Sequence, residues 1–378
     1  MKKINIFCLC LLVAVAGMAR TSKGLSREAS ETVAAQIYQQ WLGEQRAALA
    51  HNVSDLRIVQ NDVVMPIHIQ VFGDEPADGR SLWISMHGGG GTTQEVNDGQ
   101  WRNQTVLYTP TEGVYVCPRA PWNAWNMWFQ EPIDSVFEEL ILTLVATHHV
   151  NPDKVYVMGY SAGGDGVWRL APRMADHWAA AAMMAGHPGD VGLVNLRNMP
   201  FSIWVGGADA AYDRNKEVAQ RCLLMDSLQR QDPEGYVHEN HILAGMPHWM
   251  SRRDTAAVSW MQQYERRPHP ATVVWRQEEV LKRAFYWLEV PEAEMQRGKE
   301  VRATIRGNRI YLDRCDYSHL TLWLDDDMVD LDRRVTVYYR GRKIVSTRPE
   351  RSEANLRESL ASRRDRGYMF PAKVEVSL

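Results

Sequence analysis

Hydrophobic and polar positions change their spacing along the chain, and the spacing predicts two regions of different architecture. Between residues 60 and 265, short apolar runs alternate with longer stretches in which apolar residues recur every three or four positions. The short runs predict strands, and the longer stretches predict helices. Strands that alternate with helices favour a mostly parallel sheet with helices on both faces. The predicted strands are 63–72, 81–86, 114–117, 155–158, 179–184, 201–205 and 236–243, and the main predicted helices are 133–149, 213–231 and 254–264.

The spacing changes beyond residue 267. The sequence RRPHP at residues 266–270 interrupts the alternation of strands and helices, and the segments after it alternate apolar and polar residues with a period of two. About 110 residues of such short strands predict a small, sandwich-like β-rich domain over 268–378. The predicted strands are 273–275, 284–290, 301–305, 309–312, 320–324, 335–339, 343–346 and 373–377, with one helix at 352–363.

The first 19 residues predict a secretory signal peptide rather than a part of the fold. Two lysines open the segment, residues 4–15 are apolar, and small residues lie before a cleavage point after Ala19. A helix is predicted over 25–50, leaning on a first domain that we place at 25–266. No other stretch is long and apolar enough to span a bilayer, so the mature protein is expected to be periplasmic or secreted.

Composition narrows the range of partners. The chain has 378 residues, of which 45% are hydrophobic and 24% charged, with a formal net charge of −3. This is the balance of an ordinary globular protein and gives no reason to expect a nucleic-acid partner. Cleavage of the signal peptide would leave Cys117, Cys222 and Cys315, an odd number without the spacing of a metal site. We therefore expect at least one free thiol and no bound metal.

The strongest chemical signal is the sequence G-Y-S-A-G at residues 159–163, directly after the apolar run 155–158. It has the G-x-S-x-G pattern of a nucleophile elbow, in which a serine stands on a sharp turn between a strand and a helix. Glycines two residues before and after the serine let the strand and the helix approach closely. The pattern predicts that Ser161 is a nucleophile and that the helix after it stabilises nearby negative charge.

A second glycine-rich segment, H-G-G-G-G at residues 87–91, follows the predicted strand 81–86. Attack on a carbonyl group places negative charge on its oxygen, and exposed backbone N–H groups are needed to stabilise that charge. We predict that the N–H groups of Gly89, Gly90 and Ala162 form this oxyanion hole. His87 is expected to hold the loop by hydrogen bonding rather than to transfer protons.

A serine nucleophile needs a histidine base and an acid that orients it, in the chain order serine, acid, histidine. The loop after strand 201–205 reads G-G-A-D and ends at Asp209, and the loop after strand 236–243 contains M-P-H-W with His248. Asp209 is the predicted acid, and His248 is the predicted base. Asp213 is the alternative acid, although a helix cap or an ion pair with its neighbour explains it more simply.

The segment P-W-N-A-W-N-M-W-F at 121–129 follows strand 114–117, where a specificity loop of such an enzyme would lie. Tryptophans among asparagines suit a flat, partly polar group such as a sugar or an aromatic acyl ester, although a packed structural loop is an equal alternative. Asn97, just beyond the glycine loop, is a weaker candidate that a helix cap also explains. The pocket candidates are Trp122, Trp125, Trp128, His187 and Trp249.

Together, G-Y-S-A-G, H-G-G-G-G, G-G-A-D and M-P-H-W resemble the motifs of the α/β-hydrolase superfamily. Over residues 60–265 the chain resembles its secreted esterases related to polyhydroxybutyrate depolymerases, feruloyl esterases and phospholipase/carboxylesterase proteins. The resemblance implies an α/β-hydrolase fold, with Ser161 as nucleophile, His248 as base, Asp209 as orienting acid and no cofactor.

The leading hypothesis is a secreted serine hydrolase that cleaves carboxylic esters through an acyl-enzyme. Its expected partner is a small-molecule or glycan-linked ester, with an acyl or feruloyl ester on a polysaccharide as the preferred substrate. The alternatives are a serine peptidase of the prolyl-oligopeptidase type and a non-catalytic binding protein on the same fold.

Overall fold

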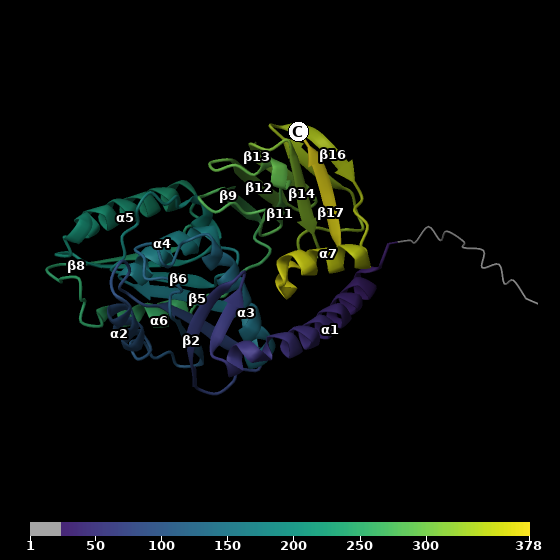
Figure 1. Ribbon diagram of the computed structural model, residues 1–378. Helices are drawn as coiled ribbons and strands as arrows, with labels where there is room; N and C mark the ends of the chain where they lie inside the picture. The colour runs from purple at the N-terminus through teal and green to yellow at the C-terminus, as the bar shows by residue number, and fades with distance from the viewer. Residues whose placement is uncertain (1–23) are drawn as a thin grey trace, which may run out of the picture.

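The computed structural model describes residues 24–378, so the predicted signal peptide lies outside the described residues. Figure 1 shows two sheet-containing parts joined side by side. Helix α1 (Arg27–Ser54), predicted at 25–50, packs against α3 (Pro132–His148) of the first part and α7 (Glu353–Arg363) of the second. None of the helices within residues 24–378 is both long and apolar enough to cross a membrane.

The first part is built on an eight-stranded sheet with the order β1-β2-β4-β3-β5-β6-β7-β8. The pairs β1–β2 and β2–β4 are antiparallel, and all other neighbouring strands are parallel. This order is that of the α/β-hydrolase fold, and it confirms the predicted fold class. The strands are β1 (Arg57–Gln60), β2 (Val63–Phe72), β3 (Arg80–Met86), β4 (Gly113–Pro118), β5 (Val150–Tyr160), β6 (Ala180–Met184), β7 (Phe201–Gly206) and β8 (His238–Leu243).

Helices cover both faces of this sheet. Successive strand residues point to opposite sides, so they pack alternately against the helices of one face and of the other. In β3, Leu82 and Ile84 join one apolar cluster, whereas Trp83 between them joins another. Residues of α3, α4 (Ala162–Arg173) and α5 (Arg214–Gln231) belong to the first cluster. Residues of α6 (Ala256–Met261), with Trp101 of α2 (Gln94–Gln104), pack in the second. Burial on both sides explains the continuous apolar runs of the central strands.

The second part contains a four-stranded sheet, β10-β11-β14-β17, and a five-stranded sheet, β16-β15-β13-β12-β9. Val301 and Val337 of the five-stranded sheet share an apolar cluster with Leu322 and Val374 of the four-stranded sheet. These additional sheets confirm the predicted C-terminal β-rich region. The strands are β9 (Thr272–Arg276), β10 (Ala284–Phe285), β11 (Leu288–Glu289), β12 (Glu300–Arg306), β13 (Arg309–Cys315), β14 (His319–Leu324), β15 (Val335–Tyr339), β16 (Arg342–Thr347) and β17 (Ala372–Ser377).

The single strand predicted at 284–290 is wrong. The chain instead turns at Tyr286, whose φ is 52°, so that β10 and β11 pair as a short antiparallel hairpin. The turn is fixed because the Tyr286 hydroxyl donates to Ala175 O at 3.0 Å and Trp287 Nε1 donates to Pro270 O at 2.9 Å. The alternation of apolar and polar residues could not reveal these two hydrogen bonds, because their acceptors come from distant parts of the chain.

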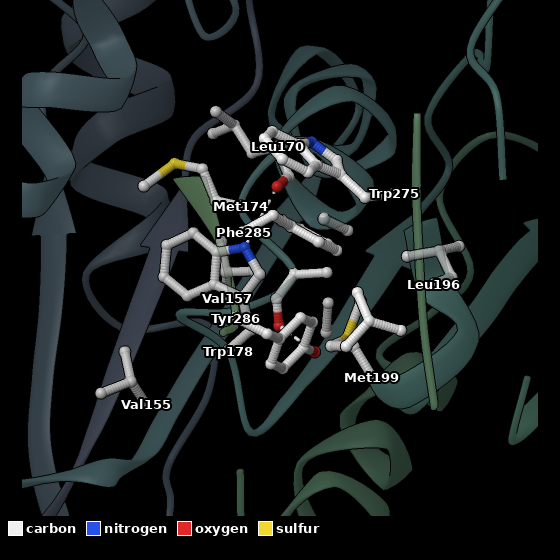
Figure 2. Packing of buried hydrophobic residues seen from close by; sticks show 14 of the residues in the cluster. Val155, Val157, Leu170, Met174, Trp178, Leu196, Met199, Trp275, Phe285 and Tyr286 are labelled. Carbon is white, nitrogen blue, oxygen red and sulfur yellow. Dashed lines mark hydrogen bonds between the residues drawn. The ribbon is translucent and has the colours of Figure 1, made fainter. Parts of the chain in front are cut away.

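The two parts share one continuous apolar core. Figure 2 shows Met174 and Trp178, which lie near the end of α4 and beyond it, beside Trp275 and Tyr286 from the C-terminal part. A buried arginine reinforces the junction: Arg266 contacts a carboxylate on each side, that of Asp153 at 2.7 Å and that of Asp365 at 2.6 Å. The C-terminal strands are therefore an integral part of the packed structure.

Candidate active site

Ser161 lies on the sharp turn between β5 and α4, with φ 58° and ψ −120°. Its N–H donates to Met184 O on β6 at 2.9 Å, which fixes the turn against the sheet. A side chain at Gly159 would collide with the backbone of Gly163, and one at Gly163 would collide with the backbone of Met86 on β3. The glycines of the motif are thus required by close backbone contact, as expected of a nucleophile elbow.

The structure brings Ser161, His248 and Asp209 into one hydrogen-bonded chain. His248 Nε2 lies 3.0 Å from Ser161 Oγ, and His248 Nδ1 lies 2.7 Å from Asp209 Oδ2. A carboxylate can only accept, so the imidazole proton is on Nδ1, and Nε2 is free to accept the serine proton. The Asp209 side chain is 2% exposed and that of His248 42% exposed.

The loops that carry the acid and the histidine are tied to each other and to β5. Gly207 N donates to Leu243 O at 2.8 Å, and Ala208 N donates to Met246 O at 2.9 Å. The Tyr160 hydroxyl donates to His248 O at 2.6 Å. These bonds hold the three side chains in register at the carboxyl ends of parallel strands.

Asp209 has a second partner that the sequence did not reveal. Arg214 Nη1 donates to Asp209 Oδ1 at 2.8 Å, and both side chains are buried. The alternative acid, Asp213, does not reach His248. It is exposed and pairs with Lys216 Nζ at 2.7 Å, and this pairing lowers the pKa of its carboxyl group.

The glycine loop differs from the prediction at Gly90. Gly90 is buried, its N–H donates to Asn97 Oδ1 at 2.9 Å, and its carbonyl accepts from Asn97 Nδ2 at 3.0 Å. This amide is therefore occupied and unable to serve an oxyanion. Gly89 and Ala162 line the cavity beside Ser161, and within residues 24–378 no acceptor takes either N–H group. The free donors are thus two of the three predicted amides.

His87 is buried beneath the loop and holds it from below. Its Nδ1 donates to Gly88 O at 2.6 Å, and its Nε2 accepts from Ala120 N at 3.1 Å. Burial is the main cause that lowers the pKa of His87 to about 4, so the ring is neutral at pH 7. This arrangement agrees with a supporting role for His87.

A cavity of about 540 Å³ opens beside Ser161. Of the predicted pocket residues, Trp125 and His187 line it, and Trp125 is 69% exposed. The other three do not: Trp128 is fully buried and donates to His87 O, Trp122 packs against the core, and Trp249 lies beside Tyr160. The tryptophan-rich segment is therefore partly a packed structural loop and partly a cavity wall.

Sequence reasoning missed the other polar walls of the cavity. Asp165 and Arg169 extend from α4, at spacings of four and eight residues from Ser161, which place them near it on one helix face. Asp165 Oδ1 accepts from His187 N at 2.6 Å, and burial raises the pKa of this carboxyl group. His187 Nδ1 accepts from Gly189 N at 3.0 Å, so its Nε2 carries the ring proton. The helical spacing was the one signal that could have found Asp165 and Arg169.

Within residues 24–378 no group of three or more His, Cys, Asp and Glu side chains is arranged to hold a metal ion. Cys117, Cys222 and Cys315 are buried and form no disulfide with one another. The strand order and the sharp turn at Ser161 together define an α/β-hydrolase fold with a serine at its nucleophile elbow.

No protein-family model matches the chain, and no curated protein matches it. Among solved structures, the chain is similar to a thermostable esterase (20% identity, TM-score 0.44), with 56% of this chain covering 64% of that one. It is also similar to the BES protein from Bacillus cereus (11% identity, TM-score 0.39, 55% of this chain and 93% of that one). A phospholipase/carboxylesterase from Dyadobacter fermentans is a third (14% identity, TM-score 0.39, 52% and 95%). At these identities and TM-scores the likeness says nothing about chemistry, which has to follow from the geometry of the site.

Proposed function

We propose that this protein is a serine hydrolase that cleaves carboxylic esters through an acyl-enzyme. The observation that carries the proposal is the hydrogen-bonded chain from Ser161 through His248 to Asp209, which ends at a cavity with two free backbone amides. Those amides, from Gly89 and Ala162, provide the donors that a tetrahedral intermediate needs.

In the proposed reaction, Ser161 Oγ attacks the acyl carbon while His248 Nε2 takes the serine proton. The carbonyl π electrons move to the oxygen, and the N–H groups of Gly89 and Ala162 stabilise the resulting negative charge. Collapse of the intermediate expels the alcohol, which receives the proton from His248. Water then attacks the acyl-enzyme by the same steps and releases the acid and Ser161. Asp209 holds the imidazole in the tautomer that both halves require.

We further propose that the ester is an acyl or feruloyl group linked to a polysaccharide. The support comes from the composition of the cavity wall, where the exposed ring of Trp125 faces the same space as Asp165, Arg169 and His187. An aromatic surface beside donors and acceptors suits a sugar or a phenolic acyl group better than a long lipid chain. A Trp125→Ala variant should raise KM for a feruloylated oligosaccharide more than for p-nitrophenyl acetate. Equal effects on both esters would contradict this substrate class.

Export from the cytoplasm is part of the proposal and rests on the pattern of the first 19 residues. The expected product is a periplasmic or secreted chain that begins just after Ala19. N-terminal sequencing of the protein from the periplasmic fraction and from the medium tests this. An uncleaved chain found only in the cytoplasm would contradict it.

The test of the chemistry is labelling with a fluorophosphonate, together with hydrolysis of short-chain aryl esters, in the wild type and Ser161→Ala. Ser259→Ala is the matched control because Ser259 is exposed on α6, away from the cavity. We expect labelling and turnover in the wild type and the control and neither in Ser161→Ala. Labelling without ester turnover would favour a peptidase, to be tested with peptide substrates. A folded wild type that is never labelled would refute the serine mechanism and favour a binding protein.

A further inference from the structure

We propose that Arg214 is a positioning residue of the triad: it fixes the Asp209 carboxylate and sets the pH at which His248 takes up a proton. Its effect on turnover rests on the proposed hydrolase function, whereas its effect on the protonation of His248 does not. The buried guanidinium of Arg214 contacts both the acid and the base, and no step of the proposed reaction uses it.

The backbone before α5 delivers this side chain to the site. Tyr212 and Asp213 both have left-handed φ values, 57° and 53°, so the chain reverses immediately before Arg214 at the start of the helix. Asn215 N donates to Asp209 O at 3.0 Å and Asn215 Nδ2 donates to Gly207 O at 2.8 Å, which fastens the helix start to the loop of the acid. Two successive non-glycine residues in this conformation are uncommon and are retained where the surrounding structure requires them.

Arg214 occupies the carboxylate oxygen that His248 does not use. Nη1 of Arg214 donates to Asp209 Oδ1 at 2.8 Å, while His248 Nδ1 donates to Oδ2 at 2.7 Å. With both oxygens engaged from different directions, the carboxylate plane is fixed. Without the guanidinium, the carboxylate would lose a charge-assisted bond and could rotate away from the imidazole.

Arg214 also acts directly on the charge of the imidazole. Its Nη1 lies 3.2 Å from His248 Nδ1, and both atoms carry protons when Nδ1 donates to Asp209. The charged and titratable groups that face His248 are the carboxylate of Asp209, this guanidinium, Asp165 from α4 and the uncharged Tyr160 phenol from β5. The two carboxyl groups favour the imidazolium, and the positive charge of Arg214, 3.2 Å from Nδ1, opposes it. Arg214 therefore helps to keep the base neutral and able to accept a proton.

A substrate-binding role is the competing explanation, because Arg214 also lines the cavity. Arg169 distinguishes the two roles, since it lines the same cavity but contacts Asp190 and Glu279 rather than the triad. Lys216 is a second comparison. It carries the same charge in the first turn of α5, its side chain is exposed, and its ammonium group pairs with Asp213 rather than with the triad.

The first experiment measures kcat, KM and the pH profile of kcat/KM in Arg214→Met, Arg214→Lys, Arg169→Met and Lys216→Met. In Arg214→Met we expect kcat to fall on the order of 10²-fold with little change in KM, because the base is misplaced. Loss of the nearby positive charge should move the acidic limb of the profile upward by about one to three pH units. Arg214→Lys should recover part of both effects, and Lys216→Met should match the wild type. A higher KM with an unmoved limb in Arg214→Met, as in Arg169→Met, would overturn the proposal.

The second experiment follows the proton on His248 directly, by NMR titration of protein labelled with ¹³C at the histidine Cε1, with His248→Gln to assign the signal. We expect the midpoint to rise by about one to three pH units in Arg214→Met and to stay near the wild-type value in Arg214→Lys. If Arg214→Met does not fold, Arg214→Met combined with Asp209→Asn removes the unpaired carboxylate and is compared with Asp209→Asn alone. A moved midpoint in a protein that hydrolyses no ester would refute the proposed function but not the role of Arg214. An unmoved midpoint in an active esterase would refute the role of Arg214.

Discussion

Substitution of Asn97 tests whether its side chain holds the glycine loop at residues 87–91 in the conformation that aims the Gly89 N–H. Its side chain accepts from Gly90 N at 2.9 Å and donates both to Gly90 O at 3.0 Å and to Asn123 Oδ1 at 2.9 Å. Truncation in Asn97→Ala removes these three bonds and a longer one from Nδ2 to Thr92 O at 3.5 Å, and leaves the buried Gly90 N–H without its acceptor. Gly89 directly precedes Gly90. In Asn97→Ala the anchor of Gly90 is lost, so the Gly89 N–H is no longer held toward the oxyanion.

The expected size of the effect follows from those bonds. A typical hydrogen bond contributes about 0.5–1.5 kcal/mol to stability, so the loss of the three shorter bonds should lower the free energy of unfolding by about 1.5–4.5 kcal/mol. Complete removal of one oxyanion donor costs about 10²–10³ in kcat. A donor that is misaimed rather than deleted should cost less, and we expect kcat to fall by about 10- to 100-fold with little change in KM.

The assay is aryl-ester hydrolysis at saturating substrate, together with urea unfolding of the same samples. Asn103→Ala is the matched control, because Asn103 lies on the same helix and is exposed. Asn97→Asp, which still accepts from Gly90 N but cannot donate to Gly90 O, should lie between Asn97→Ala and the wild type. Full kcat in a destabilised Asn97→Ala would show that the Gly90 anchor does not aim the Gly89 amide, and the reasoning would fail.

Three further predictions concern the acid, the buried histidine and the C-terminal part. Asp209→Asn should lower kcat by about 10⁴-fold because the amide favours the wrong tautomer of the base. Asp213→Asn should have wild-type kinetics. The reverse result would show that Asp213, not Asp209, orients His248. His87 has a folded pKa of about 4 against 6.5 unfolded, so the unfolded chain binds the proton first and stability should fall by roughly 3 kcal/mol between pH 6.5 and 4. Urea unfolding across that range should show a shallower fall in His87→Gln, and equal slopes would contradict the buried neutral ring. Deletion of 268–378 should give insoluble protein, because it exposes the shared apolar core; a soluble, active fragment would contradict this.

Much of the framework was predictable because it follows from local patterns. Apolar runs between glycine-rich turns gave the parallel strands, and the turn around Ser161 is fixed by glycines that lie two residues from it in the sequence. Strand ends followed by G-G-A-D and by M-P-H-W are enough to predict that Asp209 and His248 lie at one edge of the sheet. Parallel strands bring their carboxyl ends together, so order along the chain was enough.

The features that sequence reasoning missed depend on distances across the fold. Whether the amide of Gly90 is free depends on Asn97, seven residues on, whose side chain had several possible partners. In the sequence, Arg214 is the neighbour with which Asp213 could form an ion pair. In the structure, the Arg214 side chain instead points back to Asp209. Tryptophan is a residue type common in pockets, but Trp128 is fully buried in the core. Residue type and spacing cannot separate these outcomes, because each is decided by which way one side chain points.

The C-terminal sheets contact the catalytic part mainly at the opposite end from the nucleophile. Arg266 contacts Asp153 near the start of β5, and eight residues of extended strand place Ser161 about 26 Å further along. Residues of the C-terminal part also reach the cavity wall: Glu279 Oε1 lies 3.6 Å from Arg169 Nη1, and Arg297 Nη2 lies 3.2 Å from Asp190 Oδ2. Arg169 has a closer partner in Asp190 at 2.7 Å, so loss of Glu279 would leave its guanidinium paired. The C-terminal part therefore supports the sheet through packing and buried ion pairs, and its residues Glu279 and Arg297 also contact the ion pair of Arg169 and Asp190 at the cavity wall.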